Sequence, residues 1–342
     1  MNERLERLRE KMRERGIDVY VVPTSDYHES EYVSEHFACR RYITGFTGSA
    51  GTAVVTMEKA GLWTDGRYFV QAAKQLEGSG VTLQKMGVEG VPTILEYLRQ
   101  AMPEGGTLGF DGRVINELLG EEMEAAVAAR HAKIAYGEDL VGMIWADRPA
   151  LSREPVWILD EKYCGKSAAE KIADLRAAMR EAGADVHVLT ALDDIVWLLN
   201  IRGNDVPCNP VVLSYLAVTE TEVLLFIQEE ALDDSARSYL ESLGVAVKPY
   251  DSIYDYVKTL AGQAVMVEKS RVNYALCHNL DASCRVIDRM NPTALAKAVK
   301  NPVEMENIRR AHIKDGVAVT KYIYWLKKNI RKIPMDEMSV AD

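Results

Sequence analysis

Residues 5–22, LERLREKMRERGIDVYVV, decide the fold, because residues 172–189, IADLRAAMREAGADVHVL, repeat them. Nine residues are identical at a constant offset of 167, and nine identities at one offset argue against a chance alignment. The sequence therefore predicts two copies of one domain. The identical pairs are Leu8/Leu175, Arg9/Arg176, Met12/Met179, Arg13/Arg180, Glu14/Glu181, Gly16/Gly183, Asp18/Asp185, Val19/Val186 and Val21/Val188.

Each copy has the pattern of an amphipathic helix that ends at a glycine and leads into a strand. Gly16 and Gly183 are suited to helix C-caps, and β-branched residues follow each of them. Further strands are expected at 52–56 in the first copy and 210–215 in the second. A turn at 58–61 predicts a hairpin between 52–56 and 62–64, so the fold class is α/β with mixed sheets flanked by helices.

Polar, proline-containing stretches suggest where the chain divides. They lie near 147–155 and 291–302, which predicts domains at 1–152 and 153–298 and a separate segment at 299–342. Asn301-Pro302 is a good helix start, with Asn as N-cap and Pro at the first helical position. The helix it predicts, of about 28 residues, has no further core to pack against within the chain. We expect it to open another domain, and the chain to be a fragment.

Composition narrows the class of protein. Of the 342 residues, 48% are hydrophobic and 27% are charged, which is typical of a soluble globular protein. No apolar run approaches the roughly 20 residues of a membrane span, and the charged N-terminus does not resemble a secretory signal. The net charge of −10 argues against a nucleic-acid partner. Five scattered cysteines fit a reducing compartment, so the sequence predicts a cytoplasmic protein.

Two stretches carry residues that could serve chemistry, but neither has a matching pattern. The glycine-rich stretch 45–51 precedes a predicted strand, whereas a phosphate-binding loop follows a strand and opens a helix. A tight turn with close backbone approach is favoured over a nucleotide site. Potential ligands at His28, Glu29, Glu31, His36 and Cys39 lack a recognised metal-binding spacing, which favours a polar loop.

The stretch 63–68, Trp-Thr-Asp-Gly-Arg-Tyr, is more informative. Thr64 or Asp65 can cap the helix that follows, which places Arg67 in the first turn, where the helix dipole disfavours a cation. An acidic group should compensate. It is either Asp65 itself or a carboxylate from a ligand or a neighbouring subunit. In the second copy, 193–194 (Asp-Asp) is expected to cap or precede the helix that carries Trp197.

Three stretches of the first half, 23–32, 40–53 and 62–69, closely resemble the N-terminal domain of three-domain Xaa-Pro aminopeptidases (aminopeptidase P, metallopeptidase family M24). The stretches 190–203, 296–302 and 309–315 resemble later parts of the same family, so the resemblance runs nearly end to end. It implies two repeated creatinase/prolidase N-terminal-like domains, followed by the first helix of a truncated "pita-bread" catalytic domain.

The resemblance also implies an activity. Enzymes of this family release an N-terminal residue that precedes proline, and their third domain holds two metal ions, usually manganese, through two Asp, one His and two Glu. These motifs are not among residues 1–342, so we expect no catalytic residue, no metal ligand and no activity in this chain alone. In the family the N-terminal domains form a homodimer and narrow access to the active site. The arginine of the 63–68 motif, which contacts substrate, corresponds to Arg67.

Two other protein classes share such domains. One is a non-enzymatic peptide- or protein-binding module, because creatinase-like domains occur in a histone chaperone subunit whose pita-bread domain lacks the metal ligands. The other is an amidinohydrolase such as creatinase, which has one N-terminal domain where this sequence predicts two. The sequence beyond residue 342 would distinguish all three classes, through presence or absence of the five ligands.

Overall fold

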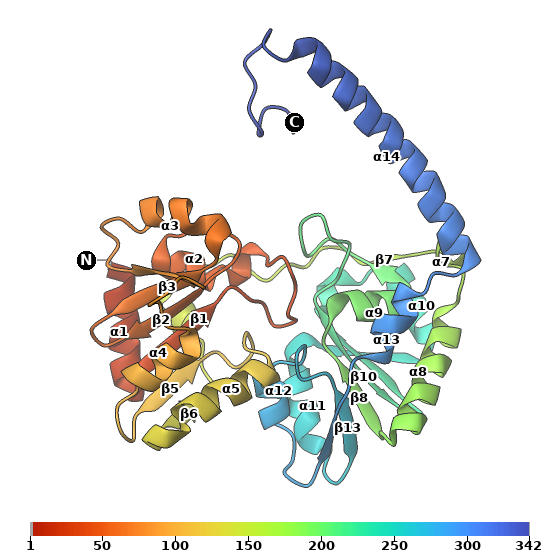
Figure 1. Ribbon diagram of the computed structural model, residues 1–342. Coiled ribbons are helices and arrows are strands. Elements are labelled where there is room, and N and C mark those ends of the chain that lie inside the picture. Colours follow the sequence, from red (N-terminus) through yellow and green to blue (C-terminus); the bar gives the residue numbers. More distant parts are fainter. Residues whose placement is uncertain (1–2, 342) are drawn as a thin grey trace.

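The computed structural model describes residues 3–341, which form two α/β domains side by side and a long helix that leaves the second (Figure 1). Domain I comprises the elements from α1 to α6, and domain II those from β7 to α13. The helices of domain I are α1 (Glu3–Arg15), α2 (Cys39–Thr44), α3 (Phe69–Gln75), α4 (Ile94–Ala101), α5 (Glu117–Val127) and α6 (Leu140–Ile144), with short 3₁₀ turns η1 (Glu35–Phe37), η2 (Gly66–Tyr68) and η3 (Ala128–Arg130).

The sheet of domain I is mixed, as predicted. Its strand order is β4-β3-β2-β1-β5-β6. β2 pairs antiparallel with both β1 and β3, which confirms the predicted hairpin, while β4, β5 and β6 join in parallel. The strands are β1 (Val19–Pro23), β2 (Thr52–Thr56), β3 (Ala60–Thr64), β4 (Thr82–Lys85), β5 (Thr107–Phe110) and β6 (Lys133–Ala135).

Domain II repeats this topology strand for strand. Its order is β12-β11-β10-β8-β13-β14, with the same parallel and antiparallel pairings. The main strands are β8 (Val186–Leu189), β10 (Ser214–Thr219), β11 (Val223–Ile227), β12 (Val245–Pro249), β13 (Ala264–Val267) and β14 (Arg285–Asp288), and β7 (Trp157–Ile158) pairs with β9 (Ile201–Arg202). The helices are α7 (Glu161–Cys164), α8 (Ala168–Ala182), α9 (Leu192–Leu198), α10 (Asp234–Ser242), α11 (Ile253–Tyr256), α12 (Tyr274–His278) and α13 (Pro292–Ala298), with η4 (Glu229–Ala231), η5 (Tyr250–Ser252) and η6 (Val257–Thr259).

The predicted strand at 210–215 is wrong in its bounds, because β10 begins only at Ser214. The residues before it form a loop that is fixed by one buried carboxylate. Asp205, 4% exposed, accepts hydrogen bonds from the backbone N–H groups of Glu154 (3.0 Å) and Leu213 (2.8 Å). The backbone before β10 is therefore held by a side chain and not by a neighbouring strand, although its apolar residues are buried like those of a strand.

The repeated residues make the same bonds in both domains. The N–H of Gly16 reaches the carbonyl of Arg13, as that of Gly183 reaches Arg180, and both glycines have φ of +64°. This left-handed conformation suits glycine, and it ends α1 and α8 in the same way. Two further residues, Asp18 and its counterpart, accept the N–H of the next parallel strand through their carboxylates, at 2.8 Å in each domain.

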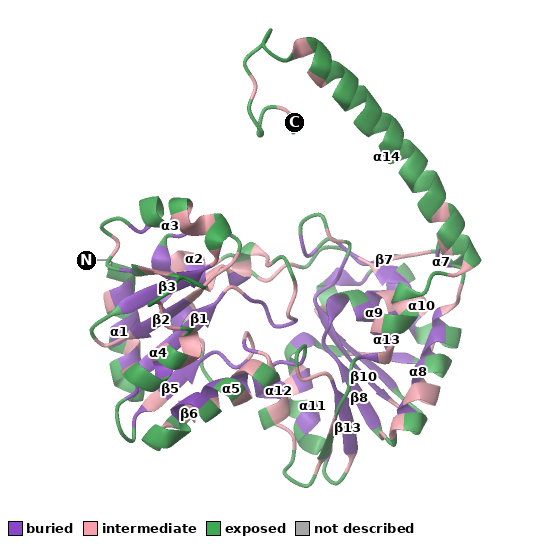
Figure 2. Cartoon of the chain, viewed as in Figure 1, coloured by how far each residue is buried: buried purple, intermediate pink, exposed green. Residues whose placement is uncertain are grey.

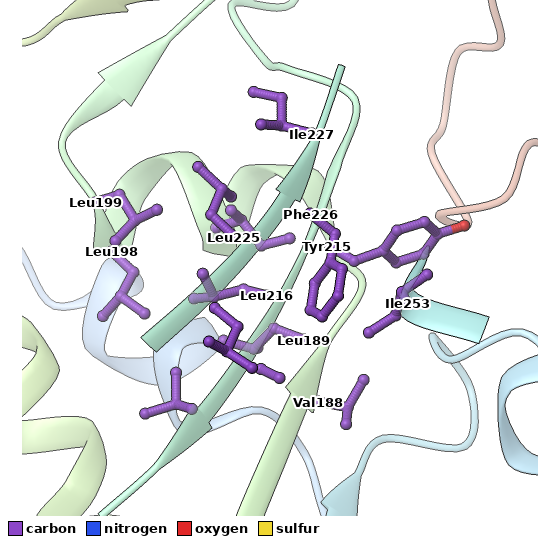
Figure 3. Packing of buried hydrophobic residues seen from close by; sticks show 14 of the residues in the cluster. Val188, Leu189, Leu198, Leu199, Tyr215, Leu216, Leu225, Phe226, Ile227 and Ile253 are labelled. Atoms are coloured by element: carbon purple, nitrogen blue, oxygen red, sulfur yellow. The ribbon is translucent and has the colours of Figure 1, made fainter. Parts of the chain in front are cut away.

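The central strands of both sheets are buried between flanking helices, whereas edge strands such as β4 and β14 are largely exposed (Figure 2). In domain II the interior is filled by neighbouring strands, with Leu216 and Tyr215 of β10 against Leu225 and Phe226 of β11 (Figure 3). Domain I has a separate cluster on each face of its sheet. Each domain is thus built around its own core, as two copies of one folding unit require, and residues such as Tyr27 and Tyr274 extend these clusters across the domain contact.

The two domains meet through equivalent loops, those before α5 and α12. The N–H of Glu117 reaches the carbonyl of Val272 (2.9 Å), and the N–H of Tyr274 reaches the carbonyl of Ile115 (2.8 Å). A second reciprocal pair flanks them, from Leu118 to Lys269 (3.1 Å) and from Ala275 to Gly112 (2.9 Å). Each hydrogen bond donated by one loop is matched by an equivalent bond donated by the other, which is the pattern of an isologous contact between two subunits.

Helix α14 (Pro302–Asn329) projects away from domain II (Figure 1). Asn301 caps it as predicted, with its side chain accepting the N–H groups of Val303 and Glu304, while Pro302 occupies the first turn. Most of the helix is exposed and no residue of it is buried (Figure 2). Its apolar residues are exposed too, among them Ile313 at 68% and Tyr324 at 65%.

The expectation that 193–194 caps or precedes α9 is wrong. The N-cap is Ala191, which makes no side-chain cap, and both aspartates lie inside the first turn. Their carboxylates pair with Lys297 of α13, whose ammonium lies 2.8 Å from Asp194 and also bonds Asp193. These three residues form the α13 latch, which holds in place the helix that leads toward α14.

Candidate functional site

Arg67 lies in the short turn η2, directly after strand β3, and its side chain is 69% exposed. Asp65 caps the turn by accepting the N–H of Arg67 at 3.0 Å, and its carboxylate also receives Nε (2.9 Å) and Nη2 (2.8 Å). These bonds lower the pKa of Asp65 to about 2 and raise that of Arg67. Of the two acidic groups that the sequence offered as partners of Arg67, the structure shows Asp65 in this role.

The same turn occurs a second time, at Asp111-Gly112-Arg113 after β5. Arg113 again bonds one carboxylate through its own N–H, Nε and Nη2, at 2.9–3.0 Å. This copy lies at the domain contact, where the guanidinium stacks over the ring of Tyr27 at 4.6 Å and is only 33% exposed. Arg113 was not among the residues predicted from the sequence, although the repeated tripeptide Asp-Gly-Arg could have revealed it. The repeat shows that the turn orients an arginine by itself, whether its surroundings are buried or open.

The surroundings of Arg67 are built by Tyr68 and the glycine-rich loop 45–51. The guanidinium carbon of Arg67 lies 5.2 Å from the centroid of the Tyr68 ring. The hydroxyl of Tyr68 bonds Ser49 Oγ at 2.6 Å. Phe46 meets the Tyr68 ring edge-to-face at 5.8 Å. A Cβ at Gly48 would lie 2.1 Å from Phe46 Cζ, so only glycine fits there. The loop is therefore a turn with close backbone approach, the alternative that the sequence favoured.

Arg40 supports this loop from inside and is only 4% exposed. Its Nε donates to Thr24 Oγ1 (2.9 Å), Nη1 to the carbonyl of Phe46 (2.5 Å) and Nη2 to that of Gly48. Burial lowers the pKa of the guanidinium to about 10. Within residues 3–341 the ion pairs include none for Arg40, so backbone carbonyls and the Phe46 ring, 4.8 Å away, balance its charge.

A cavity of about 160 Å³ opens between this loop and the segment 31–38. Arg40 and Ser49 line its inner side, while Arg41 and Glu35 pair with each other at its rim. Ser49 connects the cavity to the Arg67 turn, because it lines the cavity and bonds the hydroxyl of Tyr68. An exposed arginine held in one orientation near a cavity of mixed polar and apolar lining is suited to bind a carbonyl or carboxylate group of a ligand.

Of the potential metal ligands considered from the sequence, the two histidines have other hydrogen-bond partners. His28 is buried between the domains. Its Nδ1 donates to the carbonyl of Thr190 (2.9 Å), so its Nε2 accepts the hydroxyl of Tyr250 (2.5 Å). Burial lowers its pKa, which keeps the ring neutral. His36 instead bonds the carbonyl of Pro149. Among residues 3–341, no three His, Cys, Asp or Glu side chains form a group that could hold a metal ion.

His28 is thus a structural residue of the domain contact, which the sequence could not reveal because its partners lie 162 and 222 residues away. The cysteines at 39, 164, 208, 277 and 284 are all free thiols. In the described part of the chain, no helix is long and apolar enough to cross a bilayer.

Comparison with known proteins agrees with the repeated fold. Two family models, both described as Creatinase/Prolidase N-terminal domain, match residues 4–136 and 147–304. The chain belongs to the creatinase/prolidase N-terminal domain family. Its glycine-rich loop and Asp65–Arg67 turn lie in the first of these domains, and the α13 latch in the second.

Similar proteins carry these domains in a longer chain. A "Probable Xaa-Pro aminopeptidase P" of Neurospora crassa is 39% identical over 99% of this chain and 52% of its own length, and one of Chaetomium globosum is 40% identical over 99% and 57%. The crystal structure of an X-prolyl aminopeptidase from Caenorhabditis elegans, described as a cytosolic enzyme with a di-nuclear active site, matches with a TM-score of 0.92 and 32% identity over 99% of this chain and 58% of that one. The chain spans about half the length of the curated relatives it matches.

Proposed function

We propose that this chain supplies the N-terminal domains of an Xaa-Pro aminopeptidase, a metallopeptidase that releases an N-terminal residue preceding proline. The observation that carries the proposal is the match to X-prolyl aminopeptidase over 99% of the chain at a TM-score of 0.92. A likeness of this extent covers both domains, their contact and α14. We further propose the division 1–152, 153–298 and 299–342, with the last segment belonging to the catalytic domain.

We place the metal centre of the proposed enzyme outside this chain. A dinuclear site needs several carboxylate and imidazole ligands close together, and residues 3–341 contain no such group. The residues present do not fit the centre, so no catalytic step is assigned to them. We propose two manganese ions, held elsewhere in the complete protein, and a cytoplasmic location supported by the cytosolic relative.

The role proposed for this chain is homodimer formation and control of substrate access, with Arg67 contacting the peptide. Arg67 supports this role because it is exposed and because Asp65 fixes its orientation through Nε and Nη2, which leaves Nη1 outside the pair. A backbone carbonyl or the carboxylate of a short peptide is a suitable acceptor for such a group.

The first test is release of the N-terminal residue from an Xaa-Pro-Xaa tripeptide with added Mn²⁺, using residues 1–342 and the complete protein encoded by the gene. We expect turnover only from the complete protein. Metal-dependent turnover by the 342-residue chain would show that the metal centre is wrongly placed. Binding of the tripeptide without turnover by the complete protein would favour a non-enzymatic binding module.

The second test is Arg67→Gln in the complete protein. Loss of one charge-assisted hydrogen bond, about 1.5–3 kcal/mol, lowers kcat/KM roughly 10- to 100-fold. The matched control is Arg41→Gln, which removes an exposed arginine from the rim of the same cavity. A kcat/KM for Arg67→Gln equal to that of the wild type would remove Arg67 from substrate contact. Sedimentation of the complete protein, expected to show a dimer, tests the proposed assembly.

A further inference from the structure

A second cavity, distinct from the one beside Arg67, lies in domain II where α13 packs across α8 and α9 (Figure 1). Its volume is about 190 Å³, several times the roughly 30 Å³ that one water molecule occupies in the liquid. The side chains of Leu175, Ala178 and Ala296 make one wall apolar. The cavity therefore has room for a small organic molecule with an apolar body.

Its polar lining includes two hydrogen-bond donors without partners in the described part of the chain, together with the acidic residue Asp174. Thr293 of α13 is 2% exposed, and neither its Oγ1 nor the buried Nε1 of Trp197 has a hydrogen-bond partner within residues 3–341. Both residues line the cavity, and they come from different helices. A buried N–H and a buried hydroxyl without partners are costly, which indicates that an acceptor belongs beside them.

Lys171 adds a positive charge to the same cavity. It is 2% exposed, and its Nζ donates to the carbonyl of Trp197 (2.9 Å) and to Asn200 Oδ1 (2.6 Å), while stacking on the Trp197 ring at 4.1 Å. The ion pairs within residues 3–341 include none for Lys171, although Asp174 at the rim pairs with Lys166. Burial without a counter-ion lowers the pKa of its ammonium to about 8.

We infer that this cavity binds a small monocarboxylate with a short apolar tail. The carboxylate accepts from Trp197 Nε1 and Thr293 Oγ1 and supplies the negative charge that Lys171 lacks, while the tail lies against Leu175 and Ala296. A neutral molecule satisfies the two donors but leaves the ammonium without a counter-ion, so the charge selects the acid. This site is separate from the proposed peptidase activity and is testable on the 342-residue chain itself.

The experiment is a titration of the ¹⁵N-labelled chain with sodium isovalerate, followed through the indole N–H resonance of Trp197 and assigned by Trp197→Phe. Sodium chloride at equal ionic strength and neutral isobutyramide serve as reference titrations. We expect a saturable shift with isovalerate at a dissociation constant of about 1 mM, the strength usual for so small a ligand, and at least 10-fold weaker binding of isobutyramide.

Two variants report on the donors. Thr293→Val, which keeps the shape of the side chain, and Lys171→Met are each expected to weaken isovalerate at least 10-fold. Lys258→Met, which removes an exposed lysine paired with Asp255, leaves the affinity unchanged. The inference is overturned if the Trp197 resonance does not shift saturably, or if the acid and the amide bind with equal affinity. If Lys171→Met does not fold, unchanged isovalerate binding in Thr293→Val overturns it.

Discussion

The α13 latch permits a quantitative test, the substitution Lys297→Met. Asp194 is 4% exposed and bonds Lys297 Nζ at 2.8 Å and Asn291 Nδ2 at 3.1 Å. Removing one partner of a buried ion pair costs about 3–5 kcal/mol, because the other charge stays buried. Asp194 keeps its amide partner and its place in the first turn of α9, where the helix dipole contributes about 1 kcal/mol. We therefore expect domain II to lose about 2–3 kcal/mol of stability.

The assay is equilibrium unfolding in urea, followed by far-UV circular dichroism. With a slope of about 2 kcal/mol per molar, the loss lowers the urea midpoint by roughly 1–1.5 M. The control is Lys300→Met, since Lys300 is exposed and its ammonium bonds the backbone carbonyl of Lys297, three residues earlier. Adding Asp194→Asn to Lys297→Met removes the orphaned charge and should recover most of the loss. A midpoint for Lys297→Met equal to that of Lys300→Met refutes the latch.

Two further substitutions probe the domain contact. Gly120→Ala places a Cβ 2.1 Å from the Tyr274 ring. The cost of overpacking, about 1–3 kcal/mol, exceeds the gain in helix propensity of about 1 kcal/mol, so the urea midpoint should fall. The control is Gly137→Ala, which should leave the midpoint unchanged because the space around Gly137 is open. Burial opposes protonation of His278, but the nearby Glu117 carboxylate raises its pKa above the usual 6.5. The stability that protonated His278 contributes is therefore complete below pH 6.5 and is lost as the pH rises through the folded-state pKa. The difference in unfolding free energy between the wild type and His278→Gln should accordingly shrink from pH 6 to pH 8. A difference independent of pH would contradict this assignment.

Much of the fold was predictable because its signals are local. Gly16 ends a helix through a bond to a near neighbour in sequence, and Gly183, 167 residues later, repeats it. The bond by which Asp18 joins two strands is not local, since its partner Thr107 lies 89 residues away. The strand at 210–215 was misplaced because burial of an apolar run, not pairing, determines its pattern. The carboxylate of Asp205 and a few local backbone bonds, such as that from the Asp205 N–H to the carbonyl of Val211, hold that loop, and such bonds produce no periodicity to detect.

The candidate site was predictable only in part. A cation in a first turn pointed to Arg67 and to Asp65 as its partner, since both residues belong to one turn. The support from Arg40 could not be foreseen, because its bonds depend on how the loop 45–51 folds back over it. The same holds for His28, whose partners come from the other domain.

The reciprocal loops between the domains have a consequence for how the protein responds to dilution. Two separate copies joined by such an isologous contact would part at low concentration, but here one chain carries both halves, so the contact forms within the molecule at any concentration. A single chain also frees the halves to differ, since equivalent positions no longer have to be the same residue. Glu117 and Tyr274 occupy such positions, and the ring of Tyr274 fills the space over Gly120.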